Sequence, residues 1–190
     1  MGWVRHGRTA WNAAGKIQGQ TDIPLNEEGT AQAFRLAERL ATDELRWEAV
    51  ISSDLQRARE TARIIAQRLG IPLLPADPRL RERSFGEIEG TTEEERLQRW
   101  GPDWRKTYGG QESDDEVTRR GMAFIDDMRK AEPQHRLLVV THGSFLSRML
   151  HSLCDNLDDS YIGNMSYSIL ELRDESWVSI LHNCSMHLQD

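Results

Sequence analysis

Short runs of β-forming apolar residues recur along the chain and predict the strands of one sheet. They occupy residues 2–4, 48–52 and 137–141, and the last run is apolar almost throughout, as in a strand buried on both faces of a parallel sheet. Two further runs, 168–173 and 177–182, flank a turn-like Asp-Glu-Ser sequence and predict a closing hairpin. The sheet is therefore expected to be mostly parallel, with one antiparallel edge strand.

Segments with an apolar stripe at helical spacing alternate with these strands. One helix is expected from an Asn26 cap to about Ala41, and a second from a Ser53 cap to about Leu69, with Gly70 as its stop. A third follows the last central strand, with its stripe at Phe145, Leu146, Met149, Leu150 and Leu153. This alternation predicts a three-layer α/β/α fold with a mostly parallel central sheet.

The alternation stops between residues 78 and about 132, where helical patterns follow each other without a clear strand. Thr92 and Glu95 have capping-box spacing, and so do Ser113 and Glu116. We interpret this interval as a helical cap inserted over the site. No internal repeat, low-complexity tract or linker divides the chain, so the cap is expected to belong to a single domain.

Length, charge and cysteine content narrow the classes of partner. The 190 residues fit one domain, 1–190, with a sizeable core. A net charge of −7 disfavours nucleic acid and anionic membranes as partners, and a small molecule is expected instead. We see no signal peptide and no apolar run of about 18 residues, which predicts a cytoplasmic protein without membrane association. Cys154 and Cys184 are interpreted as packing residues.

Two histidine motifs carry the clearest chemical signal. His6 and His142 each follow β-forming residues and precede a glycine, so each is expected where a strand ends and a loop begins. In open α/β sheets, ligands bind at the carboxyl ends of the strands. The two histidines are therefore candidates for one site.

The residue types around these histidines suit phosphate chemistry. Neutral imidazole can attack phosphorus, which makes His6 a candidate nucleophile that would hold the phosphoryl group covalently. The guanidinium groups of Arg5 and Arg57 can each bind two phosphate oxygens through parallel hydrogen bonds, and His142 would add a donor when protonated. Backbone amides at Gly7 and at the helix start that follows the second histidine are expected to complete an anion site.

These residues lie within longer motifs that resemble the histidine phosphatase superfamily, also called the phosphoglycerate mutase-like family. Several separated motifs in the family's order make chance agreement improbable. The motifs are Arg5-His6-Gly7-x-Thr9-x-Trp11-Asn12, Gln18-Gly19-x-x-Asp22-x-Pro24-Leu25, Ser53-x-Leu55-x-Arg57-Ala58-x-x-Thr61-Ala62, Leu80-x-Glu82-x-x-Phe85-Gly86-x-x-Glu89-Gly90, Gly110-x-Glu112-Ser113 and Thr141-His142-Gly143.

The resemblance implies a role for each matching residue. His6 would be the phosphorylated nucleophile and Glu82 the proton donor, whose carboxyl group near a bound phosphate would keep its proton until the leaving oxygen takes it. The expected phosphate- and substrate-binding residues are Arg5, Asn12, Gln18, Gly19, Arg57, His142 and Gly143. The family cycle needs no metal and no cofactor, so none is expected here.

Among functions, hydrolysis of small phosphomonoesters through a phosphohistidine is favoured. The segment between Gly90 and Gly110 is shorter than expected for the mutases, although phosphoglycerate mutase remains the alternative. A non-catalytic phosphate-binding module is a second alternative, which the proton donor argues against. Arg8 stands where many members have Glu and could alter substrate preference. The natural substrate and the oligomeric state stay open.

Other candidate residues are interpreted as structural. Residues whose spacing fits no standard zinc pattern are assigned to packing or to the surface: His182, Cys184 and His187. Three aromatic residues are expected to pack within the cap more than to contact substrate: Trp100, Trp104 and Tyr108. Three cations of the same segment are expected to be solvated, unless they face the pocket and bind a second acidic group of the substrate: Arg99, Arg105 and Lys106.

Overall fold

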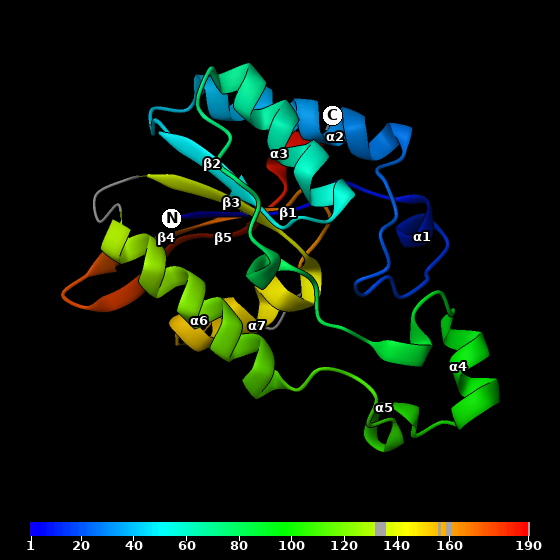
Figure 1. The fold of residues 1–190 in the computed structure, drawn as a ribbon. Helices are drawn as coiled ribbons and strands as arrows, with labels where there is room; N and C mark the ends of the chain where they lie inside the picture. Colours follow the sequence, from blue (N-terminus) through cyan, green and yellow to red (C-terminus); the bar gives the residue numbers. More distant parts are fainter. Residues whose placement is uncertain (132–135, 156, 159–160, 190) are drawn as a thin grey trace.

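The computed structural model describes residues 1–131, 136–155, 157–158 and 161–189 and is built around one sheet of five strands (Figure 1). The strands lie in the order β2-β3-β1-β4-β5. Their bounds are β1 Gly2–Arg5, β2 Ala49–Ser52, β3 Leu137–Thr141, β4 Tyr167–Arg173 and β5 Ser176–Cys184. The central pairs β2–β3 and β3–β1 are parallel, as the uninterrupted apolar run of β3 predicted.

The closing hairpin forms as predicted, and it adds two antiparallel pairings to the sheet. Asp174 and Glu175 turn the chain with positive φ angles of 46° and 65°. Strand β4 pairs antiparallel with both β1 and β5. Strand β4 is therefore the one strand of this sheet that runs opposite to the others, and it lies between β1 and the edge strand β5.

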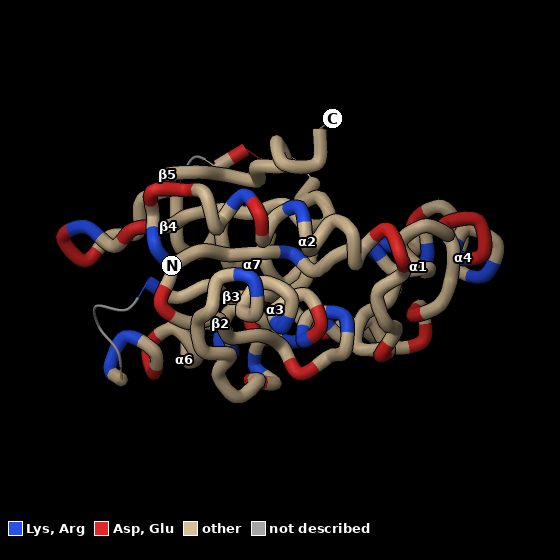
Figure 2. The backbone as a smooth tube through the Cα atoms, turned by 90° about the horizontal axis from the view of Figure 1, so that it is seen from above, with Lys and Arg blue, Asp and Glu red and all other residues tan. Residues whose placement is uncertain are grey.

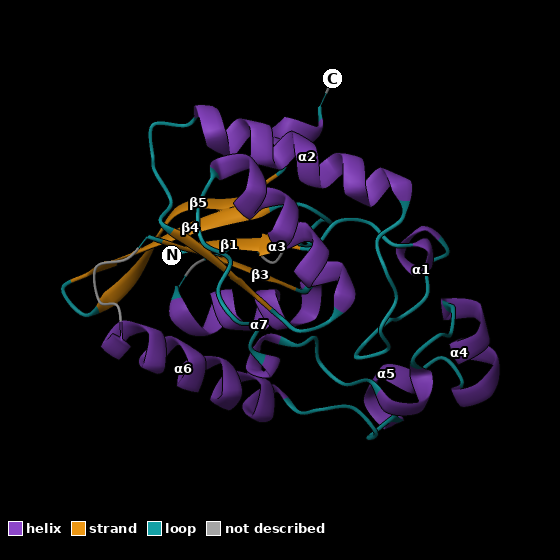
Figure 3. Ribbon diagram, turned by 45° about the horizontal axis from the view of Figure 1, so that its top comes forward, coloured by secondary structure: helices purple, strands orange, loops and turns teal. Residues whose placement is uncertain are grey.

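Helices cover both faces of the sheet and complete three layers (Figure 3). On one face lie α2 (Glu27–Thr42) and α3 (Gln56–Leu69), and on the other lie α6 (Asp114–Ala131) and α7 (Gly143–Leu153). Successive strand side chains alternate between the two faces. Val50, Leu138 and Val140 are thus buried in the α2–α3 core, whereas Ala49, Ile51, Leu137 and Val139 are buried in the α6–α7 core.

Two of the three predicted helix signals are confirmed. The Asn26 side chain accepts a hydrogen bond from the Gly29 N–H at 2.8 Å and begins α2, and Gly70 ends α3 with φ of 66°. The Ser53 cap was wrong, because α3 begins only at Gln56. A tertiary contact replaces the local cap: the Asp22 carboxylate accepts from the Gln56 N–H at 2.8 Å.

The interval predicted as a cap begins with short elements that lie beyond the carboxyl ends of the parallel strands. Helices α4 and α5 stand next to α1 at that end of the molecule (Figure 1). Their side chains pack on one another: the Trp104 indole and the Arg105 guanidinium both donate to Glu93, and Trp100 lies edge-on to Tyr108. The bounds are α1 Ala10–Ala13, η1 Pro78–Leu80, η2 Gly86–Ile88, α4 Glu93–Trp100 and α5 Trp104–Thr107.

Helix α6 lies in the same sequence interval but packs against the sheet. Both predicted capping boxes form, one at the start of α4 and one in which Ser113 and Glu116 exchange hydrogen bonds at the start of α6. The side chains of Val117, Phe124 and Ile125 are fully buried in the α6–α7 core. The interval 78–132 therefore combines an overhanging segment with one helix of the sheet layers.

Charges of both signs alternate over the surface elements, as Figure 2 shows along the backbone. Within the described residues, no helix has the length and apolar character needed to span a membrane. The chain ends in a short 3₁₀ helix, η3, over Met186–Leu188.

Phe124→Ala tests whether α6 belongs to the main core. We expect the free energy of unfolding to fall by about 3–5 kcal/mol in chemical denaturation, because a fully buried aromatic ring is lost. Leu97→Ala on α4 removes a side chain that is 44% exposed and should cost less than about 1 kcal/mol. Equal small losses in both variants would show that α6 is not part of the sheet core.

Candidate active site

Strand register brings the two histidines together at one edge of the sheet. Arg5, the last residue of β1, pairs with Thr141, the last residue of the parallel neighbour β3. His6 and His142 follow directly, and their ring centroids lie 5.1 Å apart. The loop after β1 can follow this path because Gly7 packs on the start of α2, where a Cβ would collide with the Gly29 carbonyl oxygen.

The His6 ring is held in one tautomer. Its Nδ1 lies 2.7 Å from the Gly7 carbonyl oxygen, which can only accept, so Nδ1 carries the proton and Nε2 keeps its lone pair. The ring is 2% exposed, and burial lowers its pKa well below 6.5, with the charges of Arg57 and Arg5 acting in the same direction. His6 is therefore a neutral imidazole at neutral pH with Nε2 as its nucleophilic atom.

Arg57 from α3 links the two histidines. Its Nε lies 3.3 Å from His6 Nε2 and 3.2 Å from His142 Nδ1, while its two Nη atoms donate to the carbonyl oxygens of Thr21 at 2.9 Å and Gly19 at 2.7 Å. Burial lowers the pKa of the guanidinium to about 10, so the group stays charged at neutral pH. A fixed positive charge thus lies against the His6 ring.

The loop that receives Arg57 is held by Glu89. The carboxylate of Glu89 accepts from the Gln20 N–H at 3.1 Å, the Thr21 N–H at 3.0 Å and the Thr21 hydroxyl at 2.6 Å. Gly19 has φ of 54°, and a side chain there would collide with Glu89. Glu89 belongs to the family motif in the sequence, yet only the structure reveals it as a positioning residue.

His142 donates from a neutral ring. Because its Nδ1 accepts from Arg57, the proton lies on Nε2. Burial lowers the pKa of His142 well below 6.5, so the expected protonated donor is absent from the ligand-free protein. Among the described residues, neither His142 Nε2 nor the buried Arg5 Nε has a hydrogen-bond partner. The other end of Arg5 is occupied, since its Nη1 donates to the Tyr161 hydroxyl at 2.7 Å and to the Ile162 carbonyl.

Glu82 occupies the start of α7. Its carboxylate accepts from the backbone N–H groups of Phe145 and Arg83, both at 2.8 Å, and of Ser144 at 3.0 Å. The sequence assigned the amides at this helix start, together with the Gly7 N–H, to substrate phosphate. In the ligand-free protein these amides have internal acceptors instead. A helix N-terminus attracts a nearby anion, and Glu82 supplies one, while the Gly7 N–H donates to the Thr61 hydroxyl at 3.2 Å.

Asn12 and Gln18 lie in one hydrogen-bond network around Thr9. The Thr9 hydroxyl donates to Gln18 Oε1 at 2.9 Å, and the Thr9 N–H donates to Asn12 Oδ1 at 3.2 Å. Asn164 Nδ2 donates to Asn12 Oδ1 at 3.2 Å and to the His6 carbonyl at 3.1 Å. Since both amide oxygens accept within this network, the amide nitrogens of Asn12 and Gln18 are the groups available to donate to a ligand.

These residues surround a cavity of about 550 Å³. Eight of the nine predicted site residues line this cavity. The ninth, His142, is not in its lining but contacts two lining residues, Arg57 and His6. The eight are Arg5, His6, Asn12, Gln18, Gly19, Arg57, Glu82 and Gly143. Sequence reasoning missed five charged or phenolic lining residues: Lys16, Arg83, Asp114, Arg148 and Tyr161. Arg83 and Asp114 lie within or beside the motifs, whereas no local signal marks Tyr161.

The cap residues considered as substrate contacts lie elsewhere. None of Trp100, Trp104 and Tyr108 lines the cavity among the described residues, and the same holds for Arg99, Arg105 and Lys106. Arg8 also lies outside the lining and forms an exposed ion pair with Glu28 at 2.9 Å. These observations assign the three aromatic residues to packing.

Chemically, the site combines an imidazole nucleophile, two guanidinium groups and a carboxyl group around one cavity, which fits transfer of a phosphoryl group. The model of the histidine phosphatase superfamily (branch 1) matches residues 3–185. The chain belongs to this superfamily. The resemblance seen in its motifs is confirmed over nearly the whole length.

Relatives in this superfamily include phosphatases and a probable mutase. A metal-independent phosphoserine phosphatase from Arabidopsis thaliana is 36% identical over 184 residues, which cover 92% of this chain and 77% of the relative. A probable phosphoglycerate mutase, GpmB, from Yersinia pestis is 39% identical over 165 residues, covering 79% of this chain and 72% of the relative.

Solved structures confirm the predicted fold. A mycobacterial glucosyl-3-phosphoglycerate phosphatase superposes with a TM-score of 0.86 at 28% identity, covering 97% of this chain and 99% of that chain. A phosphoserine phosphatase variant from Entamoeba histolytica, in complex with phosphoserine, gives 0.82 at 26% identity, with 99% and 98% covered. This chain is accordingly an enzyme of the phosphoglycerate mutase family and a phosphatase.

The lowered pKa of His6 predicts a pH-dependent stability. The unfolded ring has a pKa of about 6.5. As the pH falls through that value the unfolded chain takes up a proton that the folded protein does not, so the free energy of unfolding decreases. We would measure the free energy of unfolding by chemical denaturation at several pH values from about 7.5 to 5.5. It should decrease less steeply in His6→Asn than in the wild type, with slopes that differ by roughly 1 kcal/mol per pH unit. Parallel curves for the two proteins would contradict this interpretation.

Glu89→Gln tests the positioning of Arg57. The variant loses the charge that holds residues 20–21, so we expect phosphatase kcat/KM to fall about 10- to 100-fold with an unchanged unfolding midpoint. Glu87→Gln, at an exposed neighbouring position, serves as the matched control and should retain activity. Similar activities in the two variants would remove Glu89 from the site's support.

Proposed function

We propose that this phosphatase hydrolyses small phosphomonoesters without a metal, through a phosphohistidine on His6. One observation supports this most directly: the described residues leave two buried donors without an acceptor, one on Arg5 (Nε), the neighbour of His6 in the chain, and one on His142 (Nε2), whose ring centroid lies 5.1 Å from that of His6. Buried donors are normally satisfied. A phosphoryl group bonded to His6 would bring oxygen atoms to these donors and to the charge of Arg57.

In the first half-reaction, the Nε2 lone pair of His6 attacks phosphorus and the ester P–O bond breaks. The proton stays on Nδ1, hydrogen-bonded to the Gly7 carbonyl oxygen, so the ring becomes a charged phosphoimidazole without losing a proton. Arg5, Arg57 and His142 stabilise the negative charge on the phosphoryl oxygens. Glu82 in its protonated form gives its proton to the leaving alkoxide.

In the second half-reaction, water attacks phosphorus and the N–P bond breaks. Glu82, now a carboxylate, accepts the proton of that water, and inorganic phosphate leaves with the Nε2 lone pair restored. Its hydrogen bonds to Ser144, Phe145 and Arg83 fix the carboxylate in both steps. Asn12 and Gln18 would bind phosphoryl oxygens through their amide nitrogens.

The expected partner is a small phosphorylated metabolite. The cavity of about 550 Å³ is suited to such a ligand, and a net charge of −7 disfavours nucleic acid and anionic lipid. Both cysteines, Cys154 and Cys184, are free thiols, which is typical of a reducing compartment and supports a cytoplasmic location.

His6→Ala tests the covalent route. Inorganic phosphate release from a panel of phosphomonoesters, with EDTA present, should fall at least about a thousandfold in the variant. A brief reaction of the wild type should also yield an acid-labile phosphoenzyme detectable by ³¹P NMR after alkaline quenching. His151→Ala, a lining histidine outside the proposed chemistry, is the matched control.

Three results would contradict the proposal. Loss of activity in EDTA would refute metal independence. Unchanged phosphate release in His6→Ala would refute the nucleophile. Conversion of 3-phosphoglycerate to its isomer without phosphate release would establish the mutase alternative, to which the GpmB relative points.

A further inference from the structure

Glu82 lies between the short helices η1 and η2, in a segment of irregular backbone. Its carboxylate is held by N–H groups at the start of α7, but these hydrogen bonds do not fix the backbone that carries it. Two neutral side chains reach that backbone. Gln20 Nε2 donates to the Glu82 carbonyl oxygen at 3.2 Å, and the Thr141 hydroxyl donates at 2.7 Å to the carbonyl oxygen at the end of η1. Further support comes from an ion pair at α6.

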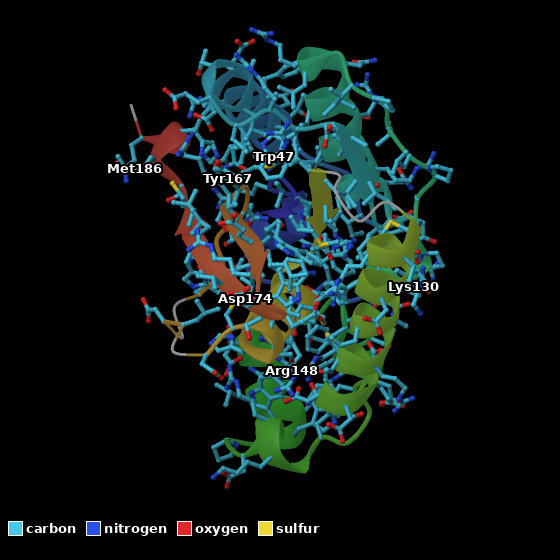
Figure 4. The ribbon with its side chains drawn as sticks, turned by 90° about the vertical axis from the view of Figure 1, so that its left-hand side faces the viewer. Trp47, Lys130, Arg148, Tyr167, Asp174 and Met186 are labelled. Carbon is cyan, nitrogen blue, oxygen red and sulfur yellow. The ribbon has the colours of Figure 1, made fainter. Side chains whose placement is uncertain are left out.

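Arg120 reaches this segment from α6. Helix α6 packs along η1 and α7, and Figure 4 shows the two longer helices side by side, with Lys130 labelled on α6 and Arg148 on α7. The Nη1 atom of Arg120 donates to the carbonyl oxygens of Arg79 and Arg81, both at 2.7 Å. The second of these carbonyl groups belongs to the residue directly before the proton donor. One guanidinium nitrogen therefore binds the backbone on the N-terminal side of that residue.

Glu112 holds the Arg120 guanidinium and the other side of the same segment. Its carboxylate accepts from Arg120 Nε at 2.7 Å and from Nη2 at 2.9 Å, and this paired arrangement fixes the plane of the guanidinium group. The Glu112 N–H donates to the Ser84 carbonyl oxygen at 2.8 Å, and its carboxylate accepts from the Ser84 N–H at 3.3 Å. The Arg120–Glu112 pair thus binds the backbone on both sides of Glu82.

The pair is mostly shielded from water and also touches the helix that binds the Glu82 carboxylate. The Arg120 and Glu112 side chains are 18% and 16% exposed. The guanidinium carbon of Arg120 lies 4.8 Å from the centre of the Phe145 ring, and the Phe145 N–H donates to Glu82. Exposed ion pairs hold their partners loosely because water competes for each charge. A shielded pair with this many backbone contacts instead fixes the geometry of the segment.

We propose that Arg120 and Glu112 are positioning residues that hold the proton donor Glu82 against the leaving group. The inference rests on the proposed function, in which Glu82 protonates the leaving alkoxide. Neither positioning residue is among the described residues that line the catalytic cavity, so both act through the backbone of residues 79–84 and not on the substrate. Their contribution should therefore grow with the need of the leaving oxygen for a proton, since a small displacement of a catalytic group has a large effect on rate.

Two aryl phosphates of similar shape measure proton donation. Phenyl phosphate releases a basic phenolate that requires a proton, whereas 2,4-dinitrophenyl phosphate releases a stable anion that does not. The measured quantity is the ratio of kcat/KM for phenyl phosphate to kcat/KM for 2,4-dinitrophenyl phosphate. Both values come from one enzyme preparation, so the ratio does not depend on the fraction of enzyme that is folded. A general loss of phosphate binding lowers both values and leaves the ratio unchanged.

We expect Arg120→Gln to lower this ratio about 10- to 100-fold relative to the wild type, because a displaced carboxyl group no longer reaches the leaving oxygen. Glu112→Gln keeps the size of the side chain and should lower the ratio about 10-fold, so it provides the same test if the arginine variant does not fold. Glu82→Gln should give the largest decrease. Arg129→Gln, on the same helix, breaks an exposed ion pair with Glu175 and should leave the ratio unchanged.

Failure of this inference and failure of the proposed function give different results. Absence of His6-dependent hydrolysis, or an unchanged ratio in Glu82→Gln, overturns the function on which the inference rests. A lowered ratio in Glu82→Gln together with unchanged ratios in Arg120→Gln and Glu112→Gln overturns the positioning role, even if both variants lose activity toward both esters. A lowered ratio in Arg129→Gln overturns it as well, because that ion pair does not contact the segment.

Discussion

A guanidinium group buried between two imidazole rings is the interaction on which the site depends. Arg57 is fully buried, and its hydrogen bonds go to two ring nitrogens and two backbone carbonyl oxygens. Burying a charge without a directly bonded carboxylate is costly. Burial, with this charge acting in the same direction, lowers the pKa of His6 and His142 and keeps both rings neutral, which leaves a lone pair on His6 Nε2 and a donor on His142 Nε2. None of the described carboxylates bonds to Arg57, so the phosphate dianion of the proposed substrate would supply the missing counter-charge.

The surrounding fold serves this arrangement through backbone geometry. Parallel register between β1 and β3 sets the spacing of the two histidines. Glycines at positions 7 and 29 let the loop after β1 approach α2 closely. Glu89 fixes the loop whose carbonyl oxygens receive Arg57, although it lies in a segment far along the chain. Each of these features positions a site residue, namely His6, His142 or Arg57, and none of them lies in the position of a ligand.

Internal carboxylates occupy anion-binding positions in the ligand-free protein. Glu82 takes the N–H groups at the start of α7, and Asp114 takes part of the Arg83 and Arg148 guanidinium groups. The first arrangement fixes the Glu82 carboxylate, since it cannot rotate away without leaving these amides unsatisfied. The second keeps two cations near each other despite their mutual repulsion.

The sequence by itself determined the three-layer class and the central parallel strands, and it picked out nine candidate site residues, eight of which line one cavity. It could do so because strand and helix periodicity and short motifs are local properties of the chain. Only the tertiary structure decided which donors meet which acceptors. It assigned the amides after Gly143 to Glu82, replaced the Ser53 cap by Asp22, and placed α6 in the sheet layer. It also brought Arg83, Asp114 and Arg148 together. These contacts join residues that are distant along the chain, and no local pattern encodes the distance between two such segments in space.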